Sequence, residues 1–145
     1  TSVFIGKDIE KTLSIEGFYT DLGEASLSGD NGDLFTLDGT NYQFTSTGSI
    51  AIGATTMGIA GKLKFDMADS LRGYVKGGLH SWEAEAKVAT TTASATATTD
   101  GTDLLWGVGA EYDIGEKTAL LVGYDNFKLD DETVTFLHAG ILFKF

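Results

Sequence analysis

Four charged residues in this chain are the strongest candidates for chemistry. They are two carboxylates and two amines, Glu16, Glu111, Lys62 and Lys76, and each stands in a segment where polar and apolar residues alternate. Charged side chains that are buried together must form ion pairs, because burying an unpaired charge costs several kcal/mol of folding free energy. The pattern therefore predicts an interior ion-pair network. It is either a static filling of the core or a switchable plug in a small channel, and we favour the static filling.

Catalytic chemistry is the second possibility, suggested by the neighbouring residues His80, Ser81 and Glu83. A nucleophile must lie within hydrogen-bond reach of its base. Alternation along a strand places His80 and Ser81 on opposite faces, and His138 lies on another segment without an obvious serine partner. We therefore predict no catalytic residue and expect that the chain is not an enzyme.

Metal and cofactor binding is the third possibility. The oxygen-rich segment 30–33 (DNGD) resembles a cation site, but it lacks the spacing and the distal glutamate of an EF-hand loop. Ordinary solvated surface charge is the favoured interpretation of the acidic residues. We predict no metal site and no cofactor.

The elements that carry these residues are alternating segments, in which every second residue is apolar. We expect strands at residues 2–8, 12–24, 49–65, 70–88, 103–113, 118–128 and 133–145. The connections at 8–11, 66–69, 113–117 and 129–132 are short, whereas those at about 24–48 and 89–102 are long and polar. Within the first long connection, 34–47 alternates again and predicts a hairpin extension. The Thr/Ala-rich segment 89–99 is expected to be a mobile loop tip.

On each of these strands the apolar residues occupy one face. We expect this face to point outward to lipid rather than inward to the core of a soluble protein. No charge falls in the middle of any set, and aromatic residues stand at both ends, where a membrane interface favours them. The last segment, 137–145, ends on an exposed aromatic strand that a barrel would pair and bury in lipid. The predicted interface aromatics are Tyr19, Phe65, Trp106, Tyr112, Tyr124, Phe143 and Phe145.

Composition narrows the possible classes further. The chain has 145 residues, 19 glycines, no proline, no cysteine and a formal net charge of -11. The length suits one domain, residues 1–145. The charge argues against nucleic-acid binding, which needs a basic surface. No apolar run approaches the roughly 18–20 residues of a membrane helix. The residues together predict an all-β, antiparallel, up-and-down transmembrane β-barrel.

Several segments resemble the OmpA-like transmembrane β-barrel family. They are LSIEGFYTDLGEA (13–25), LRGYVKGGLHSW (71–82), WGVGAEYDIGEKTALLVGYDNF (106–127) and AGILFKF (139–145). The resemblance implies an eight-stranded barrel in the Gram-negative outer membrane, with interior charges at the positions of Glu16, Lys62, Lys76 and Glu111. Because about seven strands are visible, we expect the first strand of the parent to be missing. Some relatives have an interior arginine where this chain has Leu121.

The leading functional hypothesis is an integral outer-membrane protein with a structural, envelope-integrity role and long extracellular loops at about 24–48 and 89–102. The alternatives are a low-conductance, porin-like pore for small solutes and a loop-mediated adhesion or binding module. A soluble lipid-binding barrel would leave the rim aromatics unexplained. Expected partners are outer-membrane lipid and lipopolysaccharide, and the barrel-assembly machinery through the C-terminal strand. Protein partners are not identified, and no nucleic acid is expected.

Overall fold

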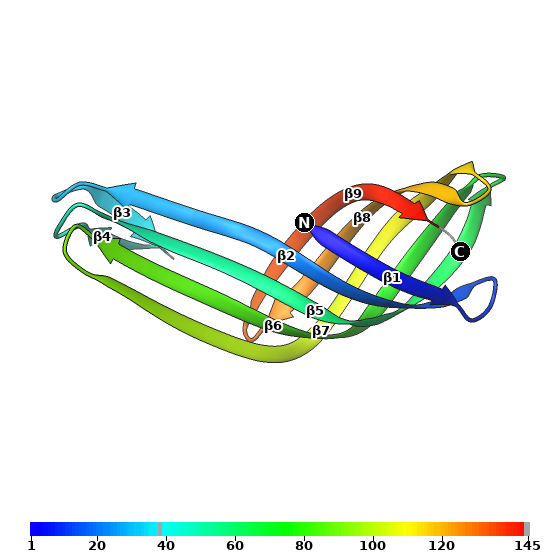
Figure 1. Cartoon of the computed structure of the whole chain (residues 1–145), viewed down its shortest axis with the longest axis horizontal. Helices are drawn as coiled ribbons and strands as arrows, with labels where there is room; N and C mark the ends of the chain where they lie inside the picture. The colour runs from blue at the N-terminus through cyan, green and yellow to red at the C-terminus, as the bar shows by residue number, and fades with distance from the viewer. Residues whose placement is uncertain (38, 144–145) are drawn as a thin grey trace.

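The structure is a computed structural model that describes residues 1–37 and 39–143. Within these residues the chain forms nine strands and no helix (Figure 1). The strands are β1 (Ser2–Asp8), β2 (Leu13–Gly29), β3 (Leu34–Leu37), β4 (Thr40–Gln43), β5 (Gly48–Ala68), β6 (Leu71–Thr90), β7 (Ser94–Gly115), β8 (Thr118–Leu129) and β9 (Glu132–Phe143). The described part of the chain thus contains no helix with the length and apolar character needed to cross a membrane.

Seven of the strands form one curled, antiparallel sheet in the order β1-β2-β5-β6-β7-β8-β9. The neighbours in this order follow one another along the chain, apart from the β3–β4 hairpin inserted between β2 and β5. The seven segments predicted from alternation correspond to these seven strands. The curl brings Phe4 of β1 and His138 of β9 together, with ring centroids 5.3 Å apart. The two outermost strands of the sheet therefore face each other across its interior.

Alternate side chains point to the exterior and to the interior of the curled sheet, as predicted. Outward residues such as Ile59, Val108 and Val122 are exposed, whereas the inward-facing Tyr74 and Glu111 retain only 1% and 2% of their accessible surface. The charged and polar interior and the apolar exterior are the reverse of a soluble barrel. The burial pattern thus removes the soluble lipid-binding barrel from the alternatives.

Two predicted loops are instead largely strand. The prediction of a long loop at residues 89–102 is wrong in its secondary structure, since β6 continues to Thr90 and β7 begins at Ser94. The loop predicted at 24–48 is shortened in the same way by the ends of β2 and β5, and the hairpin expected inside it is confirmed as β3–β4. The Thr/Ala sequence was expected to be a mobile loop tip, but its residues 94–99 pair with β6 on one side, which satisfies part of their backbone groups.

The lengthened strands project beyond the barrel. Residues 21–29 of β2, 48–55 of β5, 82–90 of β6 and 94–103 of β7 make a four-stranded extension, here called the protruding sheet, with the β3–β4 hairpin at its tip (Figure 1). Strands β1, β8 and β9 do not pair with it in the described residues. The protruding sheet is therefore a single layer that none of these three strands extends at either edge.

A β-bulge marks the base of the protruding sheet. The register of β2 against β5 shifts between Asp21 and Gly23, and Gly23 has a φ of 93°, a conformation that glycine adopts without strain. One extra residue reverses the alternation beyond this point. Glu24 consequently shares the outward face with Asp21, although their sequence spacing would place them on opposite faces.

Candidate functional site

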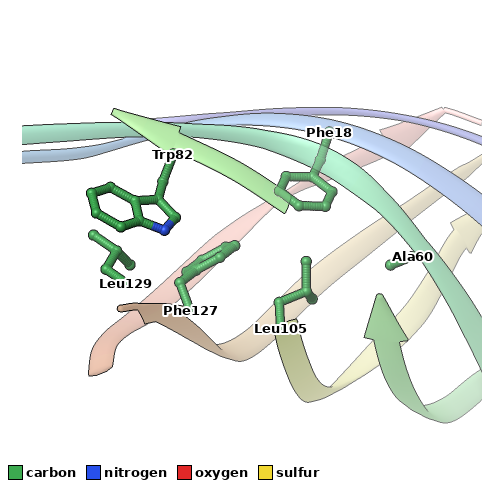
Figure 2. Packing of buried hydrophobic residues seen from close by; sticks show 6 residues of the cluster. All are labelled: Phe18, Ala60, Trp82, Leu105, Phe127 and Leu129. Atoms are coloured by element: carbon green, nitrogen blue, oxygen red, sulfur yellow. The ribbon is translucent and has the colours of Figure 1, made fainter. Parts of the chain in front are cut away.

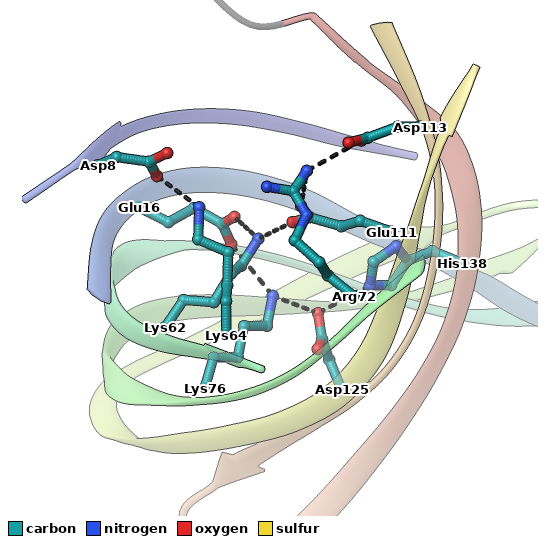
Figure 3. A network of polar contacts seen from close by, with 10 residues as sticks. All are labelled: Asp8, Glu16, Lys62, Lys64, Arg72, Lys76, Glu111, Asp113, Asp125 and His138. Carbon is teal, nitrogen blue, oxygen red and sulfur yellow. Dashed lines mark hydrogen bonds and ion pairs between the residues drawn. The ribbon is translucent and has the colours of Figure 1, made fainter. Parts of the chain in front are cut away.

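The candidate site is the ion-pair network in the barrel interior. Lys62 of β5 and Lys76 of β6 lie directly opposite each other in register. Like charges in this arrangement repel, so carboxylates from neighbouring strands must separate them. Glu16 comes from β2 on one side and Glu111 from β7 on the other. The structure thus brings together all four charged residues that the sequence singled out (Figure 3).

The contacts of the two lysines are short and buried. Lys62 Nζ lies 2.7 Å from Glu16 Oε2 and 3.4 Å from Glu111 Oε1. Lys76 Nζ lies 3.2 Å from Glu16 Oε1 and 2.8 Å from Asp125 Oδ2. Each of the four predicted side chains retains less than a tenth of its accessible surface. Glu16 therefore bridges the two lysines, while Glu111 does not contact Lys76.

Four residues outside the predicted set extend the network. Asp125 of β8 forms an ion pair with Lys76, and its Oδ2 lies 3.1 Å from His138 Nε2. At the other end, Arg72 Nη2 lies 3.5 Å from Glu111 Oε2 and 2.9 Å from Asp113 Oδ1. The alternation of β8, with Leu120, Val122 and Tyr124 outward, was the signal that would have placed Asp125 inside.

The extended network runs through the interior as a chain of alternating charge. Its order is His138, Asp125, Lys76, Glu16, Lys62, Glu111, Arg72 and Asp113. Leu121 is also buried and faces the interior opposite Glu111. Alternating charges with several contacts each hold a fixed arrangement, which favours a static filling over a movable plug.

An apolar layer closes the interior beside the network, towards the protruding sheet (Figure 2). Phe18 and Phe127 form its centre, with ring centroids 5.9 Å apart. Trp82 completes it, and its Nε1 donates a hydrogen bond to Asp103 Oδ2 over 2.9 Å. The members of this apolar plug are Phe18, Ala60, Trp82, Leu105, Phe127 and Leu129.

Glycine is required where the network touches the barrel wall. A Cβ on Gly107 would overlap Asp125 Oδ1 and come within 3.0 Å of Lys76 Cε. We expect Gly107→Ala to lower the free energy of unfolding by about 1–3 kcal/mol, since an added methyl group must displace a packed ion pair. Urea titration of the protein folded in lipid vesicles measures this loss.

The matched control is Gly61→Ala on the outward face. A Cβ at Gly61 meets only Gly77 O, at 4.0 Å, so the same substitution has room there. An equal loss in the two variants would contradict the tight contact between Gly107 and the network.

The predicted interface aromatics lie on the outward face wherever the structure describes them. Trp106 and Tyr124 are neighbours with ring centroids 6.2 Å apart, near the protruding sheet. Phe65 and Tyr112 lie near the opposite, short-turn end, and Phe143 pairs with Thr118 there. All six are exposed, namely Tyr19, Phe65, Trp106, Tyr112, Tyr124 and Phe143. Phe145 lies outside the described residues.

The residues considered for catalysis do not come together. His80 is buried and its Nδ1 lies 2.6 Å from Thr56 Oγ1. Ser81 is exposed on the other face, and its hydroxyl pairs with that of Thr102 at 3.0 Å. His80 and Ser81 therefore do not form a pair of catalytic base and nucleophile.

The acidic residues of segment 30–33 form hydrogen bonds within their own turn. Asp33 Oδ2 accepts a hydrogen bond from the Asp30 amide over 2.8 Å, and Asp30 Oδ1 accepts one from Thr47 over 3.0 Å. Across the described ranges, no group of three or more His, Asp or Glu side chains is placed to hold a metal ion. These carboxylates fix the base of the β3–β4 hairpin.

The aromatic residues of the hairpin pack on one another. The ring of Phe35 lies 5.5 Å from that of Tyr42 and 4.9 Å from that of Phe44, measured between centroids. Phe44 also covers Gly29 at the end of β2. These aromatic side chains therefore pack within the hairpin.

Comparison with known proteins gives a consistent result. A family model for the outer membrane protein beta-barrel domain matches residues 1–145. Among solved structures, Ail, the attachment invasion locus protein of Yersinia pestis, in complex with the heparin analogue sucrose octasulfate, aligns with a TM-score of 0.65 at 12% identity. A second Ail structure aligns with a TM-score of 0.58 at 14% identity. Both alignments cover 99% of this chain and 80% of the Ail chain. No curated protein matches in sequence.

Proposed function

The chain belongs to the family of outer membrane protein beta-barrel domains, and we propose that it is a closed membrane anchor with a structural role in the envelope. In this proposal the barrel conducts no solute and holds the protruding sheet beyond the bilayer. The family membership and the fold of the two Ail structures confirm the predicted antiparallel transmembrane barrel of the Gram-negative outer membrane.

The burial of the interior is the observation that carries the proposal. Tyr74, Glu111 and Asp125 point inward, yet they retain 1%, 2% and 0% of their accessible surface. Side chains that line a water-filled lumen would be accessible to water. An eight-stranded barrel has an interior just wide enough to be filled by side chains. The ion-pair network and the apolar plug supply that filling, which supports an anchor over a pore.

The outward face supports anchoring in lipid. Exposed apolar side chains continue around the sheet from Val3 on β1 to Ile141 on β9. We propose outer-membrane lipid and lipopolysaccharide as the partners of this face, and the barrel-assembly machinery as the partner of the C-terminal strand. We assign the protein no catalytic activity, and the short contacts of His80 and Ser81 with other residues support that assignment.

A binding role for the protruding sheet is the second candidate. The observation that favours it is the single open layer that extends past β1, β8 and β9. One Ail structure holds a heparin analogue, which is a polyanion. Residues 21–55 and 82–103 of this chain carry nine carboxylates and one amine, so a polyanionic ligand would be repelled. The binding candidate therefore does not include heparin-like molecules.

Conductance across a planar lipid bilayer tests the closed anchor. The purified protein should give no unitary current steps above those of the lipid alone. Lys62→Ala is measured in parallel, because it removes the amine that links Glu16 to Glu111. Current steps in the wild-type protein that change in Lys62→Ala would overturn the proposal and favour the small-solute pore.

A further inference from the structure

The protruding sheet has two chemically different faces. Pairing across β5 and β6 gathers aliphatic side chains on one face. These residues are Leu27, Ile50, Ile52, Ala86, Val88 and Ala97. Leu27, Ile52 and Val88 are more than 40% exposed. An amphipathic sheet normally buries its apolar face against another layer. In the described residues only the β3–β4 hairpin approaches it, at its far end.

The opposite face is acidic. Asp100 of β7 lies opposite Glu83 of β6, Glu83 lies opposite Thr55 of β5, and Thr55 lies opposite Asp21 of β2. The bulge at Gly23 adds Glu24 to the same face. Carboxylates directly across from each other repel. In the described residues Glu83 and Asp100 have no ion-pair partner, so a cation supplied from outside would relieve this repulsion.

The edge of β7 is the third feature. Pairing between β7 and β8 begins at Leu105, so residues 94–103 pair with β6 alone in the described structure. Ten residues of backbone are thus open on one side, and all residues from Ser94 to Asp100 are exposed. Natural proteins usually protect such an edge with proline, lysine, a bulge or a covering loop. This segment contains no proline or lysine, and its register with β6 is unbroken.

The other edge of the protruding sheet is less suited to pairing. The bulge between Asp21 and Gly23 twists β2 at the point where β1 stops pairing with it. Phe44 of the hairpin covers the far end of β2 at Gly29. A bulge and a covering side chain are two of the devices that prevent strand addition. The open edge of β7 has neither.

We propose that the β7 edge binds an extended polypeptide segment of another protein, in which basic and apolar residues alternate, as an additional strand of the protruding sheet. Main-chain hydrogen bonds to β7 provide the attachment, and the alternate side chains provide the selectivity. Basic residues on one side of the added strand meet Asp100 and Glu83. Apolar residues on its other side meet Ala95 and Ala97, whose small side chains leave room for larger partners.

The inference goes beyond the closed anchor and does not depend on it. Binding to the edge requires only that the protruding sheet is accessible, which holds for protein folded in detergent micelles. Conductance measures the barrel interior, whereas binding measures the sheet edge. A failure of one proposal is therefore distinguishable from a failure of the other.

The test measures the fluorescence anisotropy of a labelled ten-residue peptide of alternating lysine and valine, added to protein folded in non-ionic micelles. Two further peptides serve as controls, one with glutamate in place of lysine and one with every backbone amide methylated. The methylated peptide keeps its charges and apolar side chains but has no N–H to donate. We expect the lysine–valine peptide to bind, the methylated form to bind at least about tenfold more weakly, and the glutamate form not to bind.

Two charge variants complete the experiment. Glu83→Gln with Asp100→Asn should weaken binding of the lysine–valine peptide by about tenfold, because both carboxylates lie beside the β7 edge. The matched control, Asp66→Asn with Asp69→Asn, removes the same charge from the end of β5 and the turn that follows it, at the other end of the molecule, and should leave binding unchanged. Absent binding, equal binding of the methylated peptide, or equal losses in the two double variants would each overturn the proposal.

Discussion

Replacing Lys76 by methionine should lower the free energy of unfolding by about 3–5 kcal/mol, because it removes one partner from a buried ionic group. Lys76 Nζ contacts both Glu16 and Asp125, at 3.2 and 2.8 Å, and its side chain is 2% exposed. Methionine has a similar length, so the change removes charge with little change in volume. Urea titration in lipid vesicles, followed by circular dichroism, measures the loss.

The matched control for this substitution is Lys87→Met on the protruding sheet. Lys87 forms an exposed ion pair with Glu85, and such pairs contribute little to stability because water screens them. A double variant, Lys76→Met with Asp125→Asn, removes a buried carboxylate together with its cation. It should lose less stability than the sum of the two single variants, because the two charges interact directly. A Lys76→Met protein as stable as Lys87→Met would refute the buried network.

Replacing Val108 by arginine should destabilise the protein in a bilayer by about 2–4 kcal/mol, the cost of a basic residue near the midplane of a lipid-facing strand. Val108 points outward on β7, between Trp106 and Tyr112 on the same face. Its side chain is 41% exposed in the isolated chain, and in the membrane lipid would cover that surface. Urea titration of the variant in vesicles gives the difference from the wild-type protein.

The control is the same substitution at Val88 on the protruding sheet. Val88 is 44% exposed, so the two sites match in residue type and in accessibility. Val88→Arg should change the free energy of unfolding by less than about 0.5 kcal/mol, as expected for a surface substitution in water. Equal losses at Val88 and Val108 would contradict the placement of the barrel in the bilayer and of the protruding sheet beyond it.

The two-residue period of the sequence was enough to predict most of the barrel. It gave the seven main strands, the outward position of residues such as Val108, and the inward position of Glu16, Lys62, Lys76 and Glu111. Alternation is a local property of an extended backbone, since successive side chains point to opposite faces. The inward or outward direction of each side chain therefore follows from the sequence, without knowledge of which strands are neighbours.

The partners within the network depended on the tertiary structure. Alternation placed the four predicted charges inside, but only the register between strands sets Lys62 opposite Lys76 and brings Glu16 between them. Asp125 of β8 joins the network through Lys76 of β6, and Arg72 of β6 joins it through Glu111 of β7. Ion pairs form between side chains on different strands, so their geometry depends on long-range pairing that a local pattern does not contain.

The protruding sheet is the clearest case in which tertiary structure overrode the local pattern. The polar, Thr/Ala-rich sequence of residues 89–102 predicted a loop, yet residues 94–102 pair with β6 as part of β7. The bulge at Gly23 reverses the faces of β2 and brings Glu24 beside the other outward carboxylates. The sequence by itself determined a membrane barrel, because alternation and aromatic placement are local. Strand lengths, register and bulges were decided by hydrogen bonds between distant segments, and these created the acidic, open-edged sheet.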